Sequence, residues 1–302
     1  LAVLLAISMI ATMAFAADAS VTVAVKAAGN VVEVKDFSKA VNTLTGISQG
    51  DNGSSWEINV STADDKAGAT LNFDDGNFED QNLWIKPIDM LKIDFFGASV
   101  STYTDMFLWP WTSYGATAGD WGFTLTPIDG LTVKAVTSAA HVDGTKPTLG
   151  GLLSYNLGFG TVAATANLDE LYSVALTGAS FGPVNANVVY EYNKKAQKIV
   201  ENAAIGLGVV TVKEQVIVDG LDSSMTLPTY FGVSGSVADV SWDVSAAWAN
   251  IKEAGKVTVT PSAEIGGACG AASWTLGVKV PVTLDGGATV GIAVPYSVSL
   301  AW

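Results

Sequence analysis

The residues with the greatest chemical reactivity are few in this chain. His141 is the only histidine, and no serine or aspartate near it forms a recognisable catalytic motif. Cys269 is the only cysteine, which excludes an internal disulfide. It lies in a glycine-rich stretch, and no basic residue adjoins it in the sequence to activate the thiol. We therefore expect a histidine in a loop, a cysteine in a turn, and no enzyme activity.

A short acidic run at residues 74–80 is the one candidate for binding a metal. Carboxylates are the ligands that Ca²⁺ prefers, but their spacing here does not match the EF-hand loop. Acidic runs are more often solvated, so we expect no cofactor and keep calcium as the only metal alternative. If the site is real, millimolar calcium should raise the melting temperature. The candidate ligands are Asp74, Asp75, Glu79 and Asp80.

The pattern that positions the other polar residues is clearest at residues 290–302. Every second residue there is apolar, and the residues between them are small or polar. A period of two over this length predicts a β-strand and excludes a helix. At about 3.3 Å per residue the strand is long enough to cross a bilayer at a tilt.

Composition and the first residues indicate an exported protein. The 302 residues have a mean hydropathy of +0.36 and 15% charged residues, against about 25% in a soluble domain. Residues 1–13 are mostly apolar and lead to Ala14-Phe15-Ala16, which predicts a signal peptide at 1–16 and one domain at 17–302. Because the chain starts at Leu1, we expect a few residues upstream. After residue 16 no apolar run reaches the roughly 18 residues of a spanning helix.

The charge of the chain argues against nucleic-acid binding. The net charge is −14, and all 15 basic residues are lysines. A protein that neutralises phosphates needs a basic patch, usually with arginine. We therefore expect no nucleic-acid partner.

Two similar segments, residues 84–93 and 123–133, predict tight β-hairpins. Each runs from an aromatic residue to a Pro-Ile-Asp turn and continues as a second strand. Proline presets φ for a turn, and the glycine of the second copy accepts positive φ. A spacing near 40 residues is also typical of propeller blades. With only two copies and no blade motif, we favour two hairpins of one sheet.

About nineteen strand candidates follow one another, and their connections mostly alternate between short and long. Short connections lie near Gly29, Asp89, Asp129, Gly158, Gly182 and Ala238, and long ones at 36–54, 98–118, 140–147, 194–199 and 220–227. The connection at Asp169-Glu170 is short where a long one is expected. This alternation is typical of an antiparallel up-and-down barrel with turns at one end and loops at the other.

Aromatic residues support the same architecture. Most of them fall near strand ends on the apolar faces, where interfacial girdles form in membrane barrels. Aromatic residues also favour strands in general, so this argument is secondary. The residues are Trp56, Trp84, Trp121, Trp242, Trp248, Trp274, Tyr296 and Trp302.

Together, the export signal, the period-two strands, the alternating connections and the terminal Tyr296-Ser-Val-Ser-Leu-Ala-Trp302 resemble bacterial outer-membrane β-barrel porins. The resemblance implies an all-β, transmembrane antiparallel up-and-down barrel of about 16 strands, with 14 to 18 as the range. It implies an outer-membrane location and contact with outer-membrane lipid, and it leaves a homotrimer open. It further implies that the barrel assembly machinery reads the final strand through Tyr296, Val298, Leu300 and Trp302.

The sequence departs from the porin pattern in three ways. General porins have an arginine cluster in a constriction, and this chain has no arginine. Nineteen is an odd number, whereas bacterial barrels have even numbers of strands. Pro261 and Pro295 fall inside predicted strands, which indicates a bulge or a wrong boundary at each. A barrel hydrolase similar to the outer-membrane phospholipase or the omptins would need a supported histidine, which His141 does not provide.

If the apolar faces contact lipid, the polar faces line a lumen. An acidic lumen would favour cations, although much of the negative charge lies in loops, where salt screens it. The predicted pore-lining residues are Lys92, Asp94, Thr124, Lys134, Asn185, Asn187, Glu191, Lys213, Asp243, Glu264 and Lys279.

The stretch around residues 104–113 is unusually aromatic for a solvated loop. It predicts a constriction folded into the lumen, and a tryptophan anchor at the membrane interface is the alternative. Deleting residues 104–113 should raise conductance if it is a constriction. The candidate residues are Asp105, Met106, Phe107, Trp109 and Trp111.

The sequence therefore predicts a porin that passes small hydrophilic solutes and ions. One alternative is a structural or adhesive surface barrel that acts through its outer loops. A secreted soluble β-sandwich or repeat protein is a second alternative, and the high apolar content and low charge argue against it.

Overall fold

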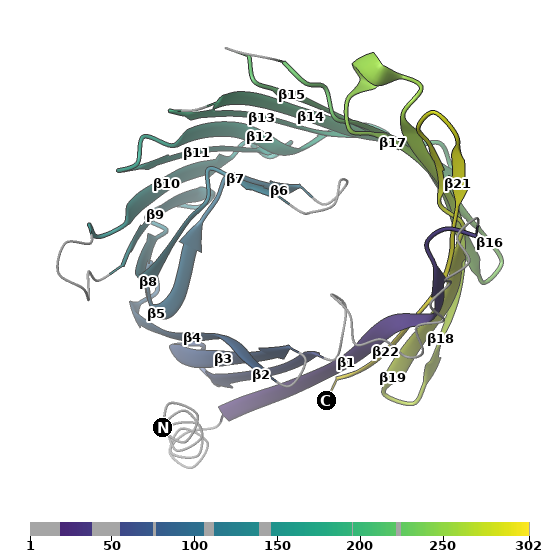
Figure 1. The fold of residues 1–302 in the computed structure, drawn as a ribbon. Helices are drawn as coiled ribbons and strands as arrows, with labels where there is room; N and C mark the ends of the chain where they lie inside the picture. The colour runs from purple at the N-terminus through teal and green to yellow at the C-terminus, as the bar shows by residue number, and fades with distance from the viewer. Residues whose placement is uncertain are drawn as a thin grey trace.

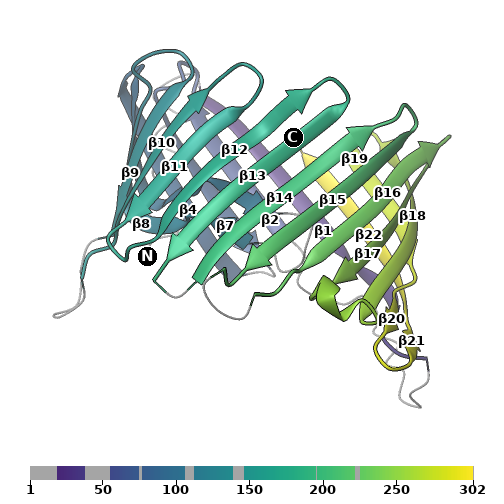
Figure 2. The ribbon, with the colours of Figure 1, turned by 90° about the horizontal axis from the view of Figure 1, so that it is seen from above.

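The computed structural model describes residues 19–37, 55–74, 77–105, 112–138, 146–194, 196–221 and 225–301. Within these residues the chain forms one closed antiparallel β-barrel whose wall has 18 strands (Figure 1). The strands are tilted relative to the barrel axis, as a closed barrel requires (Figure 2). The predicted fold class is confirmed, and the observed number lies at the upper end of the predicted range. No helix among these residues is long and apolar enough to span a membrane.

The wall strands follow one another in chain order. They are β1 (Ala19–Val34), β2 (Ser55–Thr62), β3 (Ala67–Asp74), β4 (Asn77–Ile88), β5 (Leu91–Val100), β8 (Thr117–Leu125), β9 (Leu131–Thr137), β10 (Leu149–Asn156), β11 (Thr161–Asn167), β12 (Tyr172–Phe181), β13 (Val184–Asn193), β14 (Ala196–Gly206), β15 (Val210–Asp219), β16 (Thr229–Val237), β17 (Val240–Trp248), β18 (Val257–Cys269), β19 (Ala272–Lys279) and β22 (Ile292–Ala301). Each pairs with its neighbours in this order, and β22 pairs with β1 to close the barrel.

Four short strands and one helical turn lie outside this wall. A hairpin of β6 (Tyr103–Asp105) and β7 (Thr112–Tyr114) forms a separate sheet inside the barrel (Figure 1). A second hairpin, β20 (Val282–Leu284) and β21 (Ala288–Val290), extends the edge of β18. The single 3-10 turn in the described residues, η1 (Ile251–Glu253), follows β17.

The turn predicted near Gly29 is wrong. Strand β1 continues through Gly29, which pairs with Tyr296 of β22. The register shifts between Asn30 and Glu33, so the strand bends there without ending. Pro295 lies opposite Asn30, next to this irregularity, where a missing ladder donor is tolerated.

Pro261 also lies within a wall strand, for a different reason. Strand β18 pairs with β19 from Ser262 onward and with β20 at Val257–Val259. Pro261 therefore falls where the partner of β18 changes. Its carbonyl oxygen still accepts a hydrogen bond from the Val280 backbone amide at 3.0 Å. No register shift occurs there on the β17 side, because Pro261 pairs directly with Val244.

The alternation of connections agrees with the prediction over most of the wall, and the exception at Asp169-Glu170 is confirmed. The long connection predicted at 194–199 is wrong, because β13 ends at Asn193 and β14 begins at Ala196. Asn193 pairs with Ala196, and its side chain accepts a hydrogen bond from the Ala196 amide at 3.0 Å, which closes this connection tightly. The short connection between β11 and β12 is held by the Asn167 side chain, which accepts hydrogen bonds from the amides of Asp169 and Leu171 at 3.0 Å each. Glu170 has a positive φ of 60° within it. A loop can therefore be short at the long-loop end when an Asx turn closes it.

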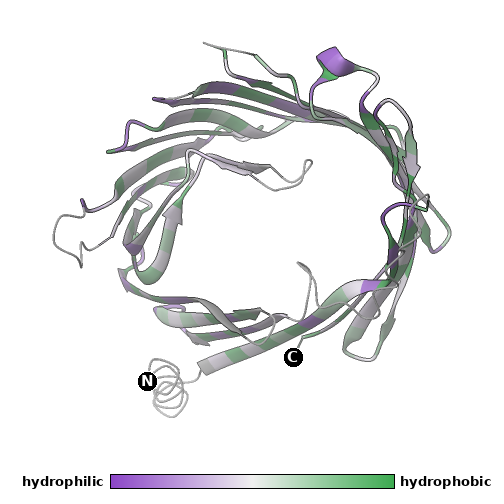
Figure 3. Ribbon diagram, viewed as in Figure 1, coloured by the Kyte–Doolittle hydropathy of each residue, from purple (hydrophilic) through white to green (hydrophobic). Residues whose placement is uncertain are grey.

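Hydrophobic and hydrophilic residues are interspersed along the strands of the wall (Figure 3). Along β8, Trp121, Phe123 and Leu125 are exposed on the outside, whereas Gly122 and Thr124 alternate with them on the inside. Because residues paired across neighbouring strands share a face, this alternation continues from strand to strand. Among the described strands the register shifts within five pairs, β1–β22, β3–β4, β4–β5, β5–β8 and β12–β13. The outer face therefore presents apolar side chains, and the inner face carries the polar ones.

Candidate functional site

The most structured feature of the lumen is the β6–β7 hairpin, which is hydrogen-bonded to the inner wall. The Thr102 hydroxyl lies 2.6 Å from the hydroxyl of Ser173 on β12. The backbone amide of Gly115 donates to the Glu191 carboxylate on β13 at 2.7 Å. The Asn202 side chain on β14 donates to the Tyr103 hydroxyl at 2.6 Å. Three consecutive wall strands thus hold the base of the hairpin.

Apolar packing reinforces these hydrogen bonds. Tyr114 is 2% exposed and contacts a buried cluster of Ala175, Val189 and Val200 on the same three strands. Its ring stacks with that of Tyr103 at a centroid distance of 6.3 Å. The hairpin is therefore a fixed part of the lumen wall at its base.

Most of the residues predicted to form a constriction belong to the segment that connects β6 to β7. Both flanks of the predicted stretch lie inside the barrel. Residues 106–111, with Met106, Phe107, Trp109 and Trp111, lie outside the described residues, and so does the side chain of Asp105. Their role as a constriction stays a prediction.

A second lumenal cluster surrounds Trp84, which the sequence placed among the outer aromatic residues. Trp84 pairs with Gly68 on one side and with Asp94 on the other, and this register puts its ring on the inner face. The Nζ atoms of Lys86 and Lys92 lie 5.1 and 5.3 Å from its ring centroid. The placement of Trp84 on the outer face is therefore wrong. Lys86, two residues further along the strand, was the available signal, because it shares the face of Trp84.

The charges near Trp84 are partly neutralised. Lys92 forms an ion pair with Asp94 at 2.7 Å, and Asp94 is only 3% exposed. Lys92, Thr124 and Lys134 lie in one row across β5, β8 and β9. Because Asp94 is already paired, it contributes little free negative charge to the lumen.

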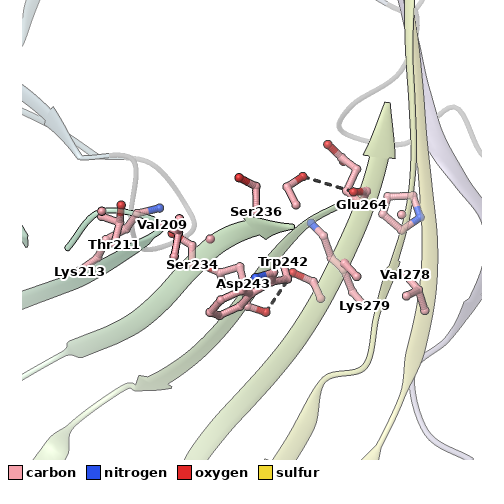
Figure 4. Close-up of a pocket in the computed structure, with 17 residues that line it drawn as sticks. Val209, Thr211, Lys213, Ser234, Ser236, Trp242, Asp243, Glu264, Val278 and Lys279 are labelled. Carbon is pink, nitrogen blue, oxygen red and sulfur yellow. Dashed lines mark hydrogen bonds between the residues drawn. The ribbon is translucent and has the colours of Figure 1, made fainter. Parts of the chain in front are cut away.

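A recess of about 650 Å³ opens on another part of the inner wall, along β15–β19 (Figure 4). Four charged residues line it, together with the hydroxyls of Ser234, Ser236 and Ser262. A neighbouring recess of about 490 Å³ shares part of this lining and reaches β1. The four charged residues are Lys213, Asp243, Glu264 and Lys279.

All eleven predicted pore-lining residues lie on the inner face by register, and their surroundings differ. Glu191 is used to hold the hairpin, as described above. Asn187 accepts a hydrogen bond from the Gly178 amide and donates to Asn202, each at 2.7 Å. Asn185 lies in one row with Lys213 through Ala204. Whether these residues line an open pore stays a prediction.

Comparison with known proteins gives a match of fold only. No family model matches the sequence, and no curated protein matches it either. Among solved structures, OccK3 (OpdO) of Pseudomonas aeruginosa is 9% identical with a TM-score of 0.59, covering 94% of this chain and 96% of its own. OpdK of the same organism, solved with vanillate, is 10% identical with a TM-score of 0.54, covering 94% and 99%. The anion-selective porin of Comamonas acidovorans is 10% identical with a TM-score of 0.50, covering 94% and 100%.

The fold is that of the outer-membrane porins. In this porin fold the last strand lies between β19 and β1, and Tyr296, Val298 and Leu300 lie on its outer, apolar face. Trp302 lies outside the described residues. That these residues form an assembly signal stays a prediction.

The remaining candidates for chemistry give no site in the part of the chain that is described. His141 and Asp75 lie outside it, as do the side chains of Asp74, Glu79 and Asp80. Cys269 is exposed at the end of β18. No group of three histidine, cysteine or acidic residues that could hold a metal ion occurs among the described residues.

The outer face of the porin fold carries two unexpected carboxylates. Glu201 pairs with Val188 and Val216, and Glu214 pairs with Ala203 and Phe231, all on the outer side of the wall. Both lie near the middle of their strands, β14 and β15. Charges at that depth are costly in a bilayer. Neither residue was predicted from the sequence to face outward.

At the short-turn end, one ion pair joins the β2–β3 turn to the β4–β5 turn, and a second joins the β2–β3 turn to the end of β4. Lys66 pairs with Asp89, and Lys86 pairs with Asp65. The hydrogen bond between Lys66 and Asp89 raises the pKa of the lysine and lowers the pKa of the aspartate. These pairs connect the β2–β3 hairpin to the β4–β5 hairpin.

Proposed function

We propose that this protein is a passive diffusion channel for small hydrophilic solutes and ions in a bacterial outer membrane. The observation that carries the proposal is the polarity of the closed barrel, apolar outside and lined by charged residues and hydroxyls inside. Barrels of 16 to 18 strands leave an aqueous channel. Diffusion through such a channel needs no reacting group, so we propose no enzyme activity.

The inner wall supports only weak selectivity for charge. Asp94 is paired with Lys92, Asp219 is paired with Lys198 at 3.2 Å, and Glu191 accepts a backbone amide. In the open recess two lysines face two acids. The net charge of −14 therefore overstates the acidity of the lumen, and we propose a smaller cation preference than the composition suggests.

The experiment that tests the proposal is planar-bilayer conductance of the detergent-folded protein. Discrete current steps in KCl are expected, with a reversal potential close to zero in a KCl gradient. A folded, detergent-stable β-barrel that gives no steps would refute the channel and move the function to the outer loops.

A further inference from the structure

Charged residues of alternating sign lie in one hydrogen-bonded row on the inner wall. Glu33, Lys279 and Asp243 come from β1, β19 and β17, and a small residue separates each from the next. The row continues onto β16 and β15 through Ser234 and Thr211. In order, the paired residues are Glu33, Ala293, Lys279, Ser262, Asp243, Ser234 and Thr211.

Two further charges flank this row. Glu264 lies two residues along β18 from Ser262, and Lys213 lies two residues along β15 from Thr211, so both face the same side of the wall. Glycines stand opposite them, because Glu264 pairs with Gly277 and Lys213 pairs with Gly232. An added Cβ at Gly232 would lie 2.6 Å from the Tyr230 hydroxyl, so the glycines themselves leave no gap. Both charged residues border open space because they line the recess (Figure 4).

The four charged residues of the recess have no charged partner within the described part of the chain. No ion pair with a described residue involves Lys213, Asp243, Glu264 or Lys279. Their charged groups also form no hydrogen bond with a described residue, because the hydrogen bonds at Asp243 and Glu264 are accepted by backbone carbonyl oxygens. Elsewhere in the same lumen, Lys92 with Asp94 and Lys198 with Asp219 do pair directly. Opposite charges that are held apart can instead be bridged by a solute that carries both signs.

The spacing sets the size of such a solute. Lys279 and Asp243 are two strands apart, which is about 10 Å between Cα atoms at about 4.8 Å per strand. The charged groups lie at the ends of the side chains, so this spacing sets only the scale of the solute, and the flexible lysine side chain adjusts the remaining distance. An amino acid, or a dipeptide of at most about 7 Å when extended, is of this scale.

We propose that this recess is a binding site for short zwitterions, with dipeptides as the best fit. The carboxylate of the solute binds Lys279 or Lys213, and its ammonium binds Asp243 or Glu264. Ser262 lies between Lys279 and Asp243, and Ser234 lies between Asp243 and β15, which carries Lys213, so a hydroxyl is available to hydrogen-bond the peptide group on either side of Asp243. This proposal rests on the proposed channel function, because the solute reaches the recess from the lumen.

The test is block of the KCl current through single channels by glycylglycine. Its singly charged relatives, N-acetylglycine and glycylglycinamide, serve as controls of similar size. We expect glycylglycine to reduce the current at a lower concentration than either relative. Asp243→Asn and Lys279→Met should each raise the half-blocking concentration about tenfold, because each removes one charge-assisted contact.

Two further variants separate the charge pattern from other effects. The exchange of both charges, Asp243→Lys with Lys279→Asp, should restore block. Lys134→Met removes a lumenal lysine on β9, outside the recess, and should leave the half-blocking concentration unchanged. The binding site is refuted, and the channel is not, if current steps are normal and all three compounds block equally. The same conclusion follows if Asp243→Asn and Lys279→Met leave the block by glycylglycine unchanged. The absence of any steps would instead overturn the channel itself.

Discussion

The hairpin inside the barrel can be tested through one glycine at its base. Gly115 has a φ of +62°, and its amide binds Glu191. A Cβ atom at this position would lie 2.0 Å from the Thr165 hydroxyl and 2.6 Å from the Ser173 Cβ. Real Cβ atoms do not approach so closely, so Gly115→Ala must move the base of the hairpin away from the wall.

The energetic cost follows from these contacts. A non-glycine residue at positive φ costs about 1 kcal/mol or more. Displacement also breaks the charge-assisted hydrogen bond to Glu191, worth about 1.5–3 kcal/mol, and the Thr102–Ser173 bond, worth about 1 kcal/mol. The hairpin should therefore lose about 3–5 kcal/mol of its attachment to the wall. The wall itself pairs strand to strand and should remain closed.

Gly182→Ala is the matched control. Gly182 has a φ of +63°, and an added Cβ would meet nothing within 4 Å. It therefore has the same backbone cost without the collision. Gly115→Ala should change single-channel conductance, increase current noise, and expose the hairpin to limited proteolysis in detergent, whereas Gly182→Ala should do none of these. Identical currents and cleavage patterns for the two variants would refute the attachment described above.

Three other predictions follow from the placement of single residues. Because Trp84 faces the lumen, brominated lipid should not quench its fluorescence. Trp84→Phe should therefore remove only the part of the tryptophan emission that brominated lipid does not quench. If the substitution instead removes emission that brominated lipid quenches, Trp84 does not face the lumen. Because two carboxylates face lipid, Glu201→Val with Glu214→Val should stabilise the barrel in vesicles, by up to about 2 kcal/mol per site; urea unfolding measures this, and a lower midpoint would count against a lipid-facing pair. Asp89 should titrate below 3.8 by NMR, and Lys66→Met should move its pKa back toward that value. The stabilisation from this pair is present above pH 3.8 and is lost as the pH falls through the lowered pKa of Asp89. It is also lost as the pH rises through the raised pKa of Lys66. If Lys66→Met leaves the pKa of Asp89 unchanged, the two residues do not pair.

The sequence alone predicted the fold class of this protein, an antiparallel β-barrel, and its number of strands only as a range. A wall strand faces lipid on one side and water on the other, so its residues must alternate with a period of two. This local constraint is readable in Val240–Trp248 or Ile292–Ala301 without knowledge of any partner strand. The same parity placed the polar residues on the inner face.

The sequence could not determine where each strand ends or which residues of neighbouring strands pair. Gly29 has the composition of a turn, yet pairing with Tyr296 on the last strand keeps β1 extended. Trp84 follows the aromatic pattern of the outer face, yet its pairing with Gly68 and Asp94 turns it inward.

The arrangement of charges in the lumen was likewise decided only by the tertiary structure. Glu33, Asp243 and Lys279 are distant in the chain, and they share one row only because strand register and barrel closure align them. Alternation along a strand fixes which face a side chain occupies. The position of that side chain relative to other strands depends on long-range hydrogen bonds, which the local sequence does not encode.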